Sequence, residues 1–188
     1  KNMVRQDIID GKGVCVIDPH GDMVGDLLGH IPESRIGDVI YFDPGNIAFP
    51  MGLNFLEYDE RYPEQKTFVV DELLAIFNKL YNMELAGGPM FEQYFRNATH
   101  LVLEDPESGS TLLEIIRVLS DKAFRDYKLS RSKNPLVNSF WRDIAEKTGG
   151  EHSLQNMIPY ITSKFDTFLS NEVMRPIIAQ QKSAFQMR

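Results

Sequence analysis

The sequence is poor in cysteine and in long apolar runs, and each shortage excludes a class of protein. With one cysteine, Cys15, among 188 residues, the chain has no internal disulfide and no cysteine-rich zinc site. His30, His100 and His152 have no cysteine or carboxylate partner at metal-ligand spacing, so we expect no structural zinc site. No apolar run approaches the ~18 residues that a membrane-spanning helix needs, and the opening residues lack the apolar segment of a signal peptide. We expect a globular protein of the reducing cytoplasm.

The chain also lacks an ordinary helix start or stop at its two ends. Residues 1–12 follow a helical pattern that no capping residue precedes, and residues 185–188 carry no terminating glycine or proline. We therefore expect these residues to be a piece of a longer protein. Their number predicts one domain or two small ones.

Short apolar runs alternate with helical patterns in residues 1–59. Residues 14–17 and 39–42 are continuous apolar runs, which are typical of strands buried on both faces of a parallel sheet. Helical patterns over residues 1–12 and 23–30 lie on either side of the first run. This order predicts an α/β fold with a parallel sheet.

From Pro63 onward the apolar spacing is helical only. The stripes cover residues 68–80, 91–103, 112–119, 124–129, 136–147, 158–169 and 172–181. We predict an all-α domain over residues 60–182, with residues 183–188 returning to the first domain. Aromatic side chains on these stripes are expected in the core: Phe68, Phe77, Phe91, Phe95, Phe140, Trp141, Phe165 and Phe168.

The sequence Asp-Pro-His-Gly-Asp at residues 18–22 directly follows the first apolar run. A carboxylate at the end of a parallel strand points toward the crevice where α/β sheets bind ligands, and Gly21 can adopt a positive φ. Asp18, His20 and Asp22 could hold Mg²⁺ through water or orient a nucleophilic water. The alternative is structural, because Asp-Pro is a common turn and Asp18 could cap the following helix.

Four motifs of the first domain resemble the HerA/FtsK superfamily of DNA-pumping ATPases. They are residues 13–22, 31–35, 38–44 and 50–57. They are most similar to type IV secretion coupling proteins, the TraG/TraD-like ATPases of conjugative DNA transfer. Further matches, less specific, resemble the all-α domain inserted in those motors: residues 91–98, 140–141 and 158–169.

The resemblance implies a partial RecA-like core, followed by a helical domain, from an ATP-driven motor that translocates DNA or nucleoprotein. In this family a P-loop, G-x-x-x-x-G-K-[ST], and a strand ending in Asp-Glu complete the active site, and both would lie outside these residues. By resemblance, Asp22 would position the attacking water and Asp18 would hold a metal-bound water. His20 and Gly21 would then lie at the nucleotide.

The resemblance also implies cofactors and partners. The intact motor would bind ATP and Mg²⁺, assemble as a homo-hexamer, and act on DNA or a relaxase nucleoprotein together with secretion channel proteins. A segment outside this chain could anchor it at the inner membrane. Without its P-loop, the piece alone would bind no nucleotide, lack ATPase activity and be monomeric.

The net charge of −7 is spread unevenly. Residues 1–59 carry four basic and ten acidic side chains, whereas residues 117–147 carry eight basic and four acidic ones. Such a basic stretch is usually a solvated face, and the alternative is a surface that contacts DNA phosphates or cargo. The candidate residues are Arg117, Lys122, Arg125, Lys128, Arg131 and Lys133.

Two other functions stay open. One is a HerA-like translocase of DNA repair or virus packaging, which a small β-barrel domain upstream would favour over a transmembrane pair. The other is a non-catalytic adaptor whose helical domain recruits cargo, which the lack of a P-loop in the parent protein would favour.

Overall fold

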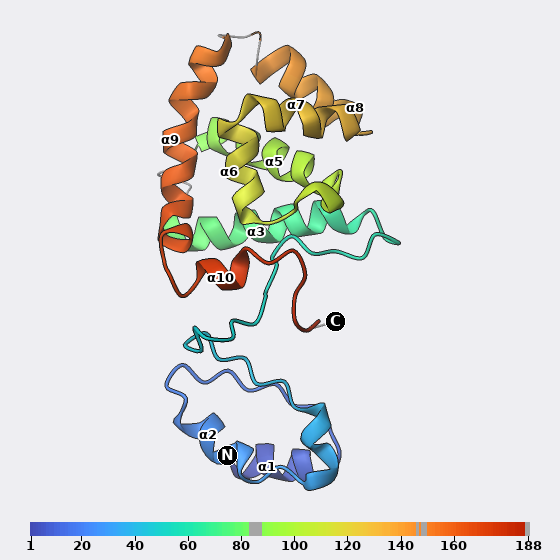
Figure 1. Ribbon diagram of the computed structural model, residues 1–188, viewed down its shortest axis with the longest axis vertical. Helices are drawn as coiled ribbons and strands as arrows, with labels where there is room; N and C mark the ends of the chain where they lie inside the picture. Colours follow the sequence, from blue (N-terminus) through green and yellow to red (C-terminus); the bar gives the residue numbers. More distant parts are fainter. Residues whose placement is uncertain (83–87, 146, 148–149, 187–188) are drawn as a thin grey trace. The chain divides into compact units, whose positions relative to one another are not determined.

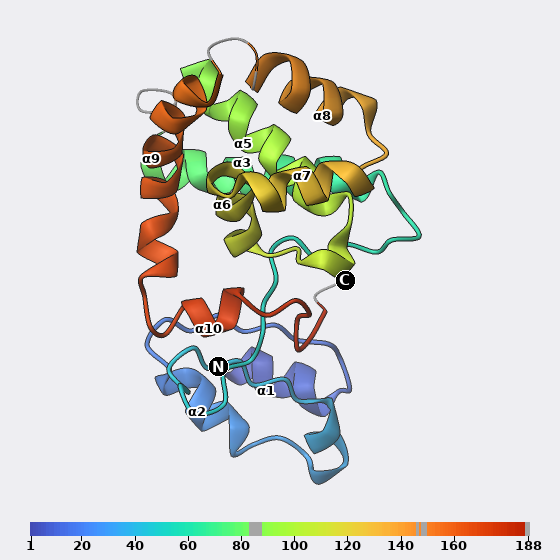
Figure 2. The same cartoon turned by 45° about the horizontal axis from the view of Figure 1, so that its top comes forward.

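The computed structural model describes residues 1–82, 88–145, 147 and 150–186, and for residues 150–153 only the backbone. The chain divides into two units, Lys1–Phe42 and Asp43–Arg188, which are coloured from blue to red along the sequence in Figures 1 and 2. Among the residues described, no helix is long and apolar enough to cross a membrane.

The first unit contains two short α-helices and a 3₁₀ helix. These are α1 (Asn2–Ile9), α2 (Asp22–Leu28) and η1 (Glu33–Asp38). Arg35 of η1 donates hydrogen bonds to the carbonyl oxygens of Ile8 at 2.9 Å and Lys12 at 3.1 Å. These bonds tie η1 to the end of α1 and to the segment that follows it.

The predicted α/β fold class, with its partial RecA-like parallel sheet, is wrong for this structure. No strand occurs anywhere in the described part of the chain, and residues 14–17 and 39–42 run without sheet pairing. Their side chains are largely open to solvent, with Ile17 87% and Ile40 59% exposed. Apolar runs become strands only where neighbouring strands and covering helices bury them, and two isolated segments bury too little surface for this.

The second unit is all-α. Its α-helices are α3 (Gln65–Tyr81), α5 (Gly88–Leu103), α6 (Leu112–Ser120), α7 (Lys122–Arg131), α8 (Pro135–Ser139), α9 (Gly150–Leu169) and α10 (Arg175–Ile178). A 3₁₀ turn, η2 (Pro106–Ser108), lies between α5 and α6, and a π-helix, η3 (Phe140–Ala145), continues α8. The predicted helices over residues 68–80, 91–103, 112–119, 124–129 and 158–169 are thus confirmed. The one predicted over residues 136–147 is helical as far as Ala145, and residue 146 lies outside the described residues. Of residues 172–181, only Arg175–Ile178 form a helix.

An aromatic cluster fills the centre of this helical unit. The Phe77 ring of α3 lies 5.3 Å from the Phe95 ring of α5 and 4.7 Å from the Phe165 ring of α9, measured between centroids. Figure 1 shows α9 running across the direction of α3 near one end of it, and α6 packs on α5 and α9. Aromatic burial is confirmed for Phe77, Phe91, Phe95, Phe140, Trp141 and Phe165, whereas Phe168 is half-buried and Phe68 is 59% exposed.

Candidate functional site

The loop at residues 18–22 is held by one carboxylate. Asp18 Oδ2 accepts hydrogen bonds from the backbone N–H groups of Met23 at 2.8 Å and Val24 at 3.1 Å, and Oδ1 accepts from the N–H of His20 at 3.2 Å. The bond from Val24 is the main cause that lowers the pKa of Asp18 below its usual range. Gly21 has φ +84°, so a residue without Cβ allows the chain to turn directly into α2.

This geometry gives Asp18 the capping role that the structural alternative predicts. Oδ2 accepts from two backbone N–H groups of the first turn of α2, and Oδ1 accepts from the N–H of His20 in the loop before it, which stabilises the ionised carboxylate there. Asp22 begins α2 with its side chain exposed, and His20 is exposed as well. Asp22 therefore keeps a carboxylate that can meet water, and the catalytic roles of both aspartates stay predictions.

The loop at residues 18–22 offers few side-chain ligands for Mg²⁺. Within the described residues there is no group of three or more His, Cys, Asp or Glu side chains placed to hold a metal ion. Both carboxylate oxygens of Asp18 already accept hydrogen bonds from the backbone, so Asp22 and His20 are the side chains of the loop that are available to bind a metal ion. Mg²⁺ keeps several waters and is commonly held by one or two carboxylates together with substrate phosphates, so Asp22 would need further ligands from outside the loop.

Two of the six basic candidates lie inside the helical unit. Arg125 is 1% exposed and donates from Nη1 to the carbonyl oxygens of Val118 at 3.0 Å and Leu119 at 3.2 Å, at the end of α6. Its guanidinium carbon also lies 5.5 Å from the centre of the Trp141 ring. Arg125 therefore does not lie on the solvated or DNA-facing surface that the sequence had suggested.

Lys128 is the second internal cation, with 0% exposure. Its Nζ donates to three backbone carbonyl oxygens: Val102 at 3.2 Å, Asp105 at 2.8 Å and Gly109 at 2.6 Å. Burial lowers the pKa of Lys128 from 10.5 to about 8. An ammonium group has three donors, and here each finds an acceptor, so Lys128 too is removed from the expected surface.

A sequence signal for this placement does exist. Phe124, Arg125, Lys128 and Leu129 follow at helical intervals on one face of α7, and all four are buried. Cations that share a face with apolar residues bury their stems in that face and carry their donors to helix ends. The number of basic residues in 117–147 does not by itself distinguish the buried cations from the exposed ones.

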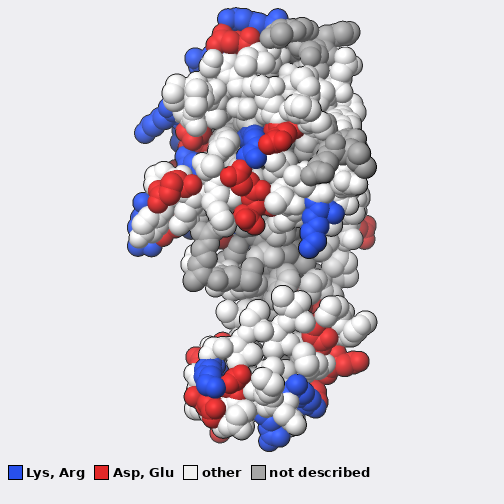
Figure 3. Space-filling model, turned by 180° about the vertical axis from the view of Figure 1, so that it is seen from behind, with Lys and Arg blue, Asp and Glu red and all other residues white. Residues whose placement is uncertain are grey.

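The other four basic candidates are exposed, and three are paired with carboxylates. Arg117 bonds Asp121 at 3.3 Å, Lys122 bonds Asp126 at 3.0 Å, and Arg131 bonds Asp105. Lys133 is exposed on the segment after α7. Figure 3 shows Lys and Arg interspersed with Asp and Glu on the face it draws.

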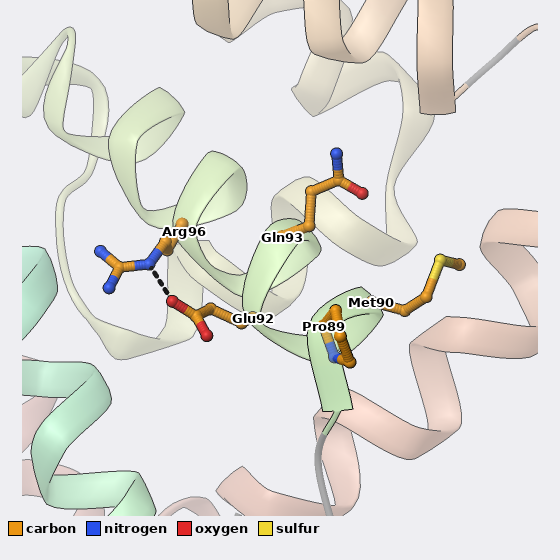
Figure 4. Close-up of a pocket in the computed structure, with 5 residues that line it drawn as sticks. All are labelled: Pro89, Met90, Glu92, Gln93 and Arg96. Atoms are coloured by element: carbon orange, nitrogen blue, oxygen red, sulfur yellow. Dashed lines mark hydrogen bonds and ion pairs between the residues drawn. The ribbon is translucent and has the colours of Figure 1, made fainter. Parts of the chain in front are cut away.

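A hollow of about 430 Å³ lies against the first turns of α5. Figure 4 shows its lining residues, Pro89, Met90, Glu92, Gln93 and Arg96. The Arg96 guanidinium is bound by Glu92 at 2.7 Å and also by Asp71 of α3. The pair with Asp71 joins α3 to α5, and the pair with Glu92 lies within α5, so the charged groups of the hollow are engaged with one another.

Two segments far apart in the sequence run side by side at one end of the helical unit. Residues 50–57 lead into the helices, and residues 177–184 lead out of them. We call this pair of segments the seam. The N–H of Leu53 donates to the Ile177 carbonyl at 3.0 Å, and the N–H of Ala184 donates to the Gly52 carbonyl at 2.9 Å. A Cβ at Gly52 would lie 2.7 Å from the Lys182 carbonyl oxygen. The seam therefore needs glycine at position 52.

Asn54 is the centre of the seam. Its Nδ2 donates to the carbonyls of Ser110 and Gln181, each at 2.8 Å, and its backbone N–H donates to Ser183 Oγ at 3.0 Å. Sequence reasoning missed Asn54 and Gln181 as organising residues, because their partners lie more than fifty positions away.

A groove of about 680 Å³ runs beside the seam. Glu57 and Asp59 line it, and both carboxylates are already engaged. Glu57 accepts from the N–H of Ser183 at 2.8 Å, and Asp59 binds Arg61 at 2.6 Å. Only the Glu57 bond joins the two segments of the seam, since Asp59 and Arg61 are neighbours in the sequence.

Comparison with known proteins adds no relative. No protein-family model matches the sequence, and neither curated proteins nor solved structures give a match. Any statement on function therefore depends on the motifs, the loop at residues 18–22 and the geometry of the helical unit.

Proposed function

We propose that the chain is part of an ATP-driven motor that moves DNA or nucleoprotein through a channel of conjugation or type IV secretion. Residues 43–186 would form the domain that meets the cargo. The seam is the observation that carries this proposal, because a domain inserted into another must receive and return the chain at neighbouring points. The motifs at residues 13–22 and 50–57 supply the resemblance to coupling proteins.

The active site of this motor would be shared with residues outside the chain. ATP and Mg²⁺ would be held mainly by residues outside the loop at residues 18–22, since Asp18 there already bonds backbone N–H groups with both carboxylate oxygens. Asp22 is our candidate for orienting a water, because its carboxylate is exposed at the start of α2. Asp18 would act through the loop, by capping α2 and fixing where Asp22 begins.

We propose that the helical unit contacts the protein part of a nucleoprotein cargo. DNA affinity depends on cations that are free to replace counterions at phosphates. Here Arg125 and Lys128 are buried, and the exposed Arg117, Lys122 and Arg131 each face a carboxylate. Such a surface favours protein recognition over sequence-independent DNA binding.

The decisive experiment is to read the parent gene on both sides of this segment and assay the whole protein. We expect a G-x-x-x-x-G-K-[ST] motif upstream, an apolar strand ending in Asp-Glu downstream, and ATP turnover that Asp22→Asn lowers by roughly 100-fold. Asp10→Asn, at an exposed position outside the loop, is the matched control and should retain turnover. Unchanged turnover in Asp22→Asn would remove the role of that residue.

The same gene also separates the alternatives. A transmembrane pair upstream would favour secretion, and a small β-barrel domain would favour a HerA-like translocase of repair or packaging. A parent protein without a P-loop would be an adaptor that recruits cargo, and the motor proposal would then be wrong.

The cargo assignment is tested by fluorescence anisotropy with a labelled oligonucleotide. We expect weak binding to the chain, and a triple variant of Arg117, Lys122 and Lys133 to Ala should change it little. Affinity that falls about 100-fold or more as salt rises from about 50 to 200 mM, and that the triple variant abolishes, would instead establish a DNA-contacting face.

A further inference from the structure

The segment between α5 and α6, residues 104–110, is where three separate parts of the helical unit meet. It contains the turn η2 (Pro106–Ser108) and Gly109, whose φ is +111°. Its contacts go inward to α7 and outward to the seam. We call it the 104–110 loop.

On its inner side the loop is fixed by buried charge. Lys128 Nζ holds the carbonyls of Asp105 at 2.8 Å and Gly109 at 2.6 Å, which are the two ends of η2. Arg131, about one turn later in α7, binds the carboxylate of Asp105, a residue that is 8% exposed. Both ends of the turn are therefore tied to one helix.

On its outer side the loop is fixed by amides of the seam. The N–H of Ser110 donates to Gln181 Oε1 at 3.0 Å, and the Ser110 carbonyl accepts from Asn54 Nδ2 at 2.8 Å. The same Asn54 amide group bonds the Gln181 carbonyl. One residue of the loop thus bonds both the segment that leads into the helices and the segment that leads out.

We infer that the 104–110 loop is a latch that couples the seam to the helical body, so that a displacement of the two segments moves the helices with them. This inference rests on the proposed function, in which the seam joins the helical domain to the moving parts of a motor. The physical reason is that a polar network whose members are mutually bonded resists the loss of any one bond. A hinge would instead leave the loop without such bonds on one side.

Amide hydrogen exchange of the full chain tests the latch from its inner side. Lys128→Met removes the bond from Nζ to the Gly109 carbonyl and one of the bonds to the Asp105 carbonyl, which keeps those from Ser108. If the loop couples the two sides, the amides of Leu53 and Ala184 in the seam should then exchange roughly tenfold faster, while amides of α9 keep their rates. Unchanged rates at Leu53 and Ala184 in a folded variant would overturn the inference.

A second variant changes the outer side of the 104–110 loop and leaves the core unchanged. Gln181→Ala removes an exposed side chain, and we expect roughly tenfold faster exchange of the Gly109 amide, which donates to the Pro106 carbonyl. Lys182→Ala is the matched control, because its side chain is exposed beside the same seam. If the Gly109 amide exchanges at the same rate in Gln181→Ala as in Lys182→Ala, the inference is wrong.

These measurements use neither nucleotide nor cargo, so they are separate from the test of the motor. Loss of the latch with intact ATP turnover would refute only the coupling. A parent protein without a P-loop, together with the expected exchange rates, would refute only the motor.

Discussion

Lys128 buries an ammonium group among three backbone carbonyls, and Arg125 buries a guanidinium group at the end of α6. The last carbonyls of a helix lack helical donors, and cations near them are favoured by the helix dipole. α7 thereby closes the ends of the two helices that precede it. Removing either cation leaves buried carbonyls without donors, which costs about 1–3 kcal/mol for each group.

The buried Lys128 predicts a pH dependence of stability. Its pKa falls from 10.5 to about 8 on folding because burial disfavours the charged form. Between these values the unfolded chain binds more protons at this position than the folded chain, so the free energy of unfolding rises with pH. As the pH rises from about 8 to 10.5, the free energy of unfolding of the native chain should increase by up to about 3 kcal/mol relative to that of Lys128→Met.

Urea unfolding followed by the fluorescence of Trp141 measures this difference. Trp141 is the one tryptophan of the chain and is fully buried in the helical unit. Lys133→Met serves as control, because Lys133 is exposed and its loss should produce no such window. A stability difference between native chain and Lys128→Met that is constant with pH would contradict the prediction.

A second residue-scale prediction concerns Gly52. Alanine there would place a methyl group 2.7 Å from the Lys182 carbonyl oxygen and 2.9 Å from Gln180 Cβ. Because the obstacle is backbone, the seam must open, and we expect Gly52→Ala to lower the free energy of unfolding by about 1–3 kcal/mol. The same unfolding assay applies, and Lys182→Ala should be neutral. An equally neutral Gly52→Ala would show that the seam can shift at little cost.

At the scale of elements, side-chain caps define where the helices begin. Thr111 Oγ1 accepts from the N–H of Leu113 at 3.2 Å, and Glu114 Oε2 accepts from the N–H of Thr111 at 2.9 Å. This reciprocal pair is a capping box, and its Thr-x-x-Glu pattern is visible in the sequence. Asp121 and Asn134 start α7 and α8 in a similar way.

Thr111→Ala should therefore lower the free energy of unfolding by about 1–2 kcal/mol, because one N–H at the first turn of α6 loses its acceptor. Ser120→Ala, at the exposed far end of the same helix, should change it by less than about 0.5 kcal/mol. Circular dichroism during thermal unfolding distinguishes the two. Equal melting temperatures would mean that water replaces the Thr111 hydroxyl without loss.

The elements differ in how far the sequence predicts them. Apolar spacing identifies α3, α5 and α6, since each presents a periodic buried face. The π-helix η3 was expected only as ordinary helix, because its wider turn depends on how Phe140 and Trp141 pack around Tyr94. The strands expected at residues 14–17 and 39–42 failed, since a strand exists only with a partner.

At the scale of the whole molecule, the two units differ in what holds them. Within Lys1–Phe42, all of which is described, Leu27 is the only buried side chain. The helical unit has a continuous aromatic and aliphatic core around Phe77, Phe95 and Phe165. A segment of about 40 residues with so little burial has few contacts to offset its chain entropy.

Limited trypsin digestion should therefore cut first at Arg5, Lys12 or Arg35, and leave the helical unit intact. Opening free energies near zero expose such sites, whereas sites within the helices α3, α5, α6 and α7 open only with the core of the helical unit. Mass spectrometry of the early fragments identifies the cuts. First cleavage within residues 65–131 would show that the helical unit is the less stable one.

Local chemistry alone determined much of this protein. Periodic apolar spacing fixed the helices, and Gly21 with Asp18 fixed the turn into α2, because these depend on neighbours within one or two turns of chain. Tertiary structure decided which cations face inward and which distant segments pair. Lys128 and Asn54 find their carbonyl acceptors on other elements, and a buried polar group is stable only where such partners converge.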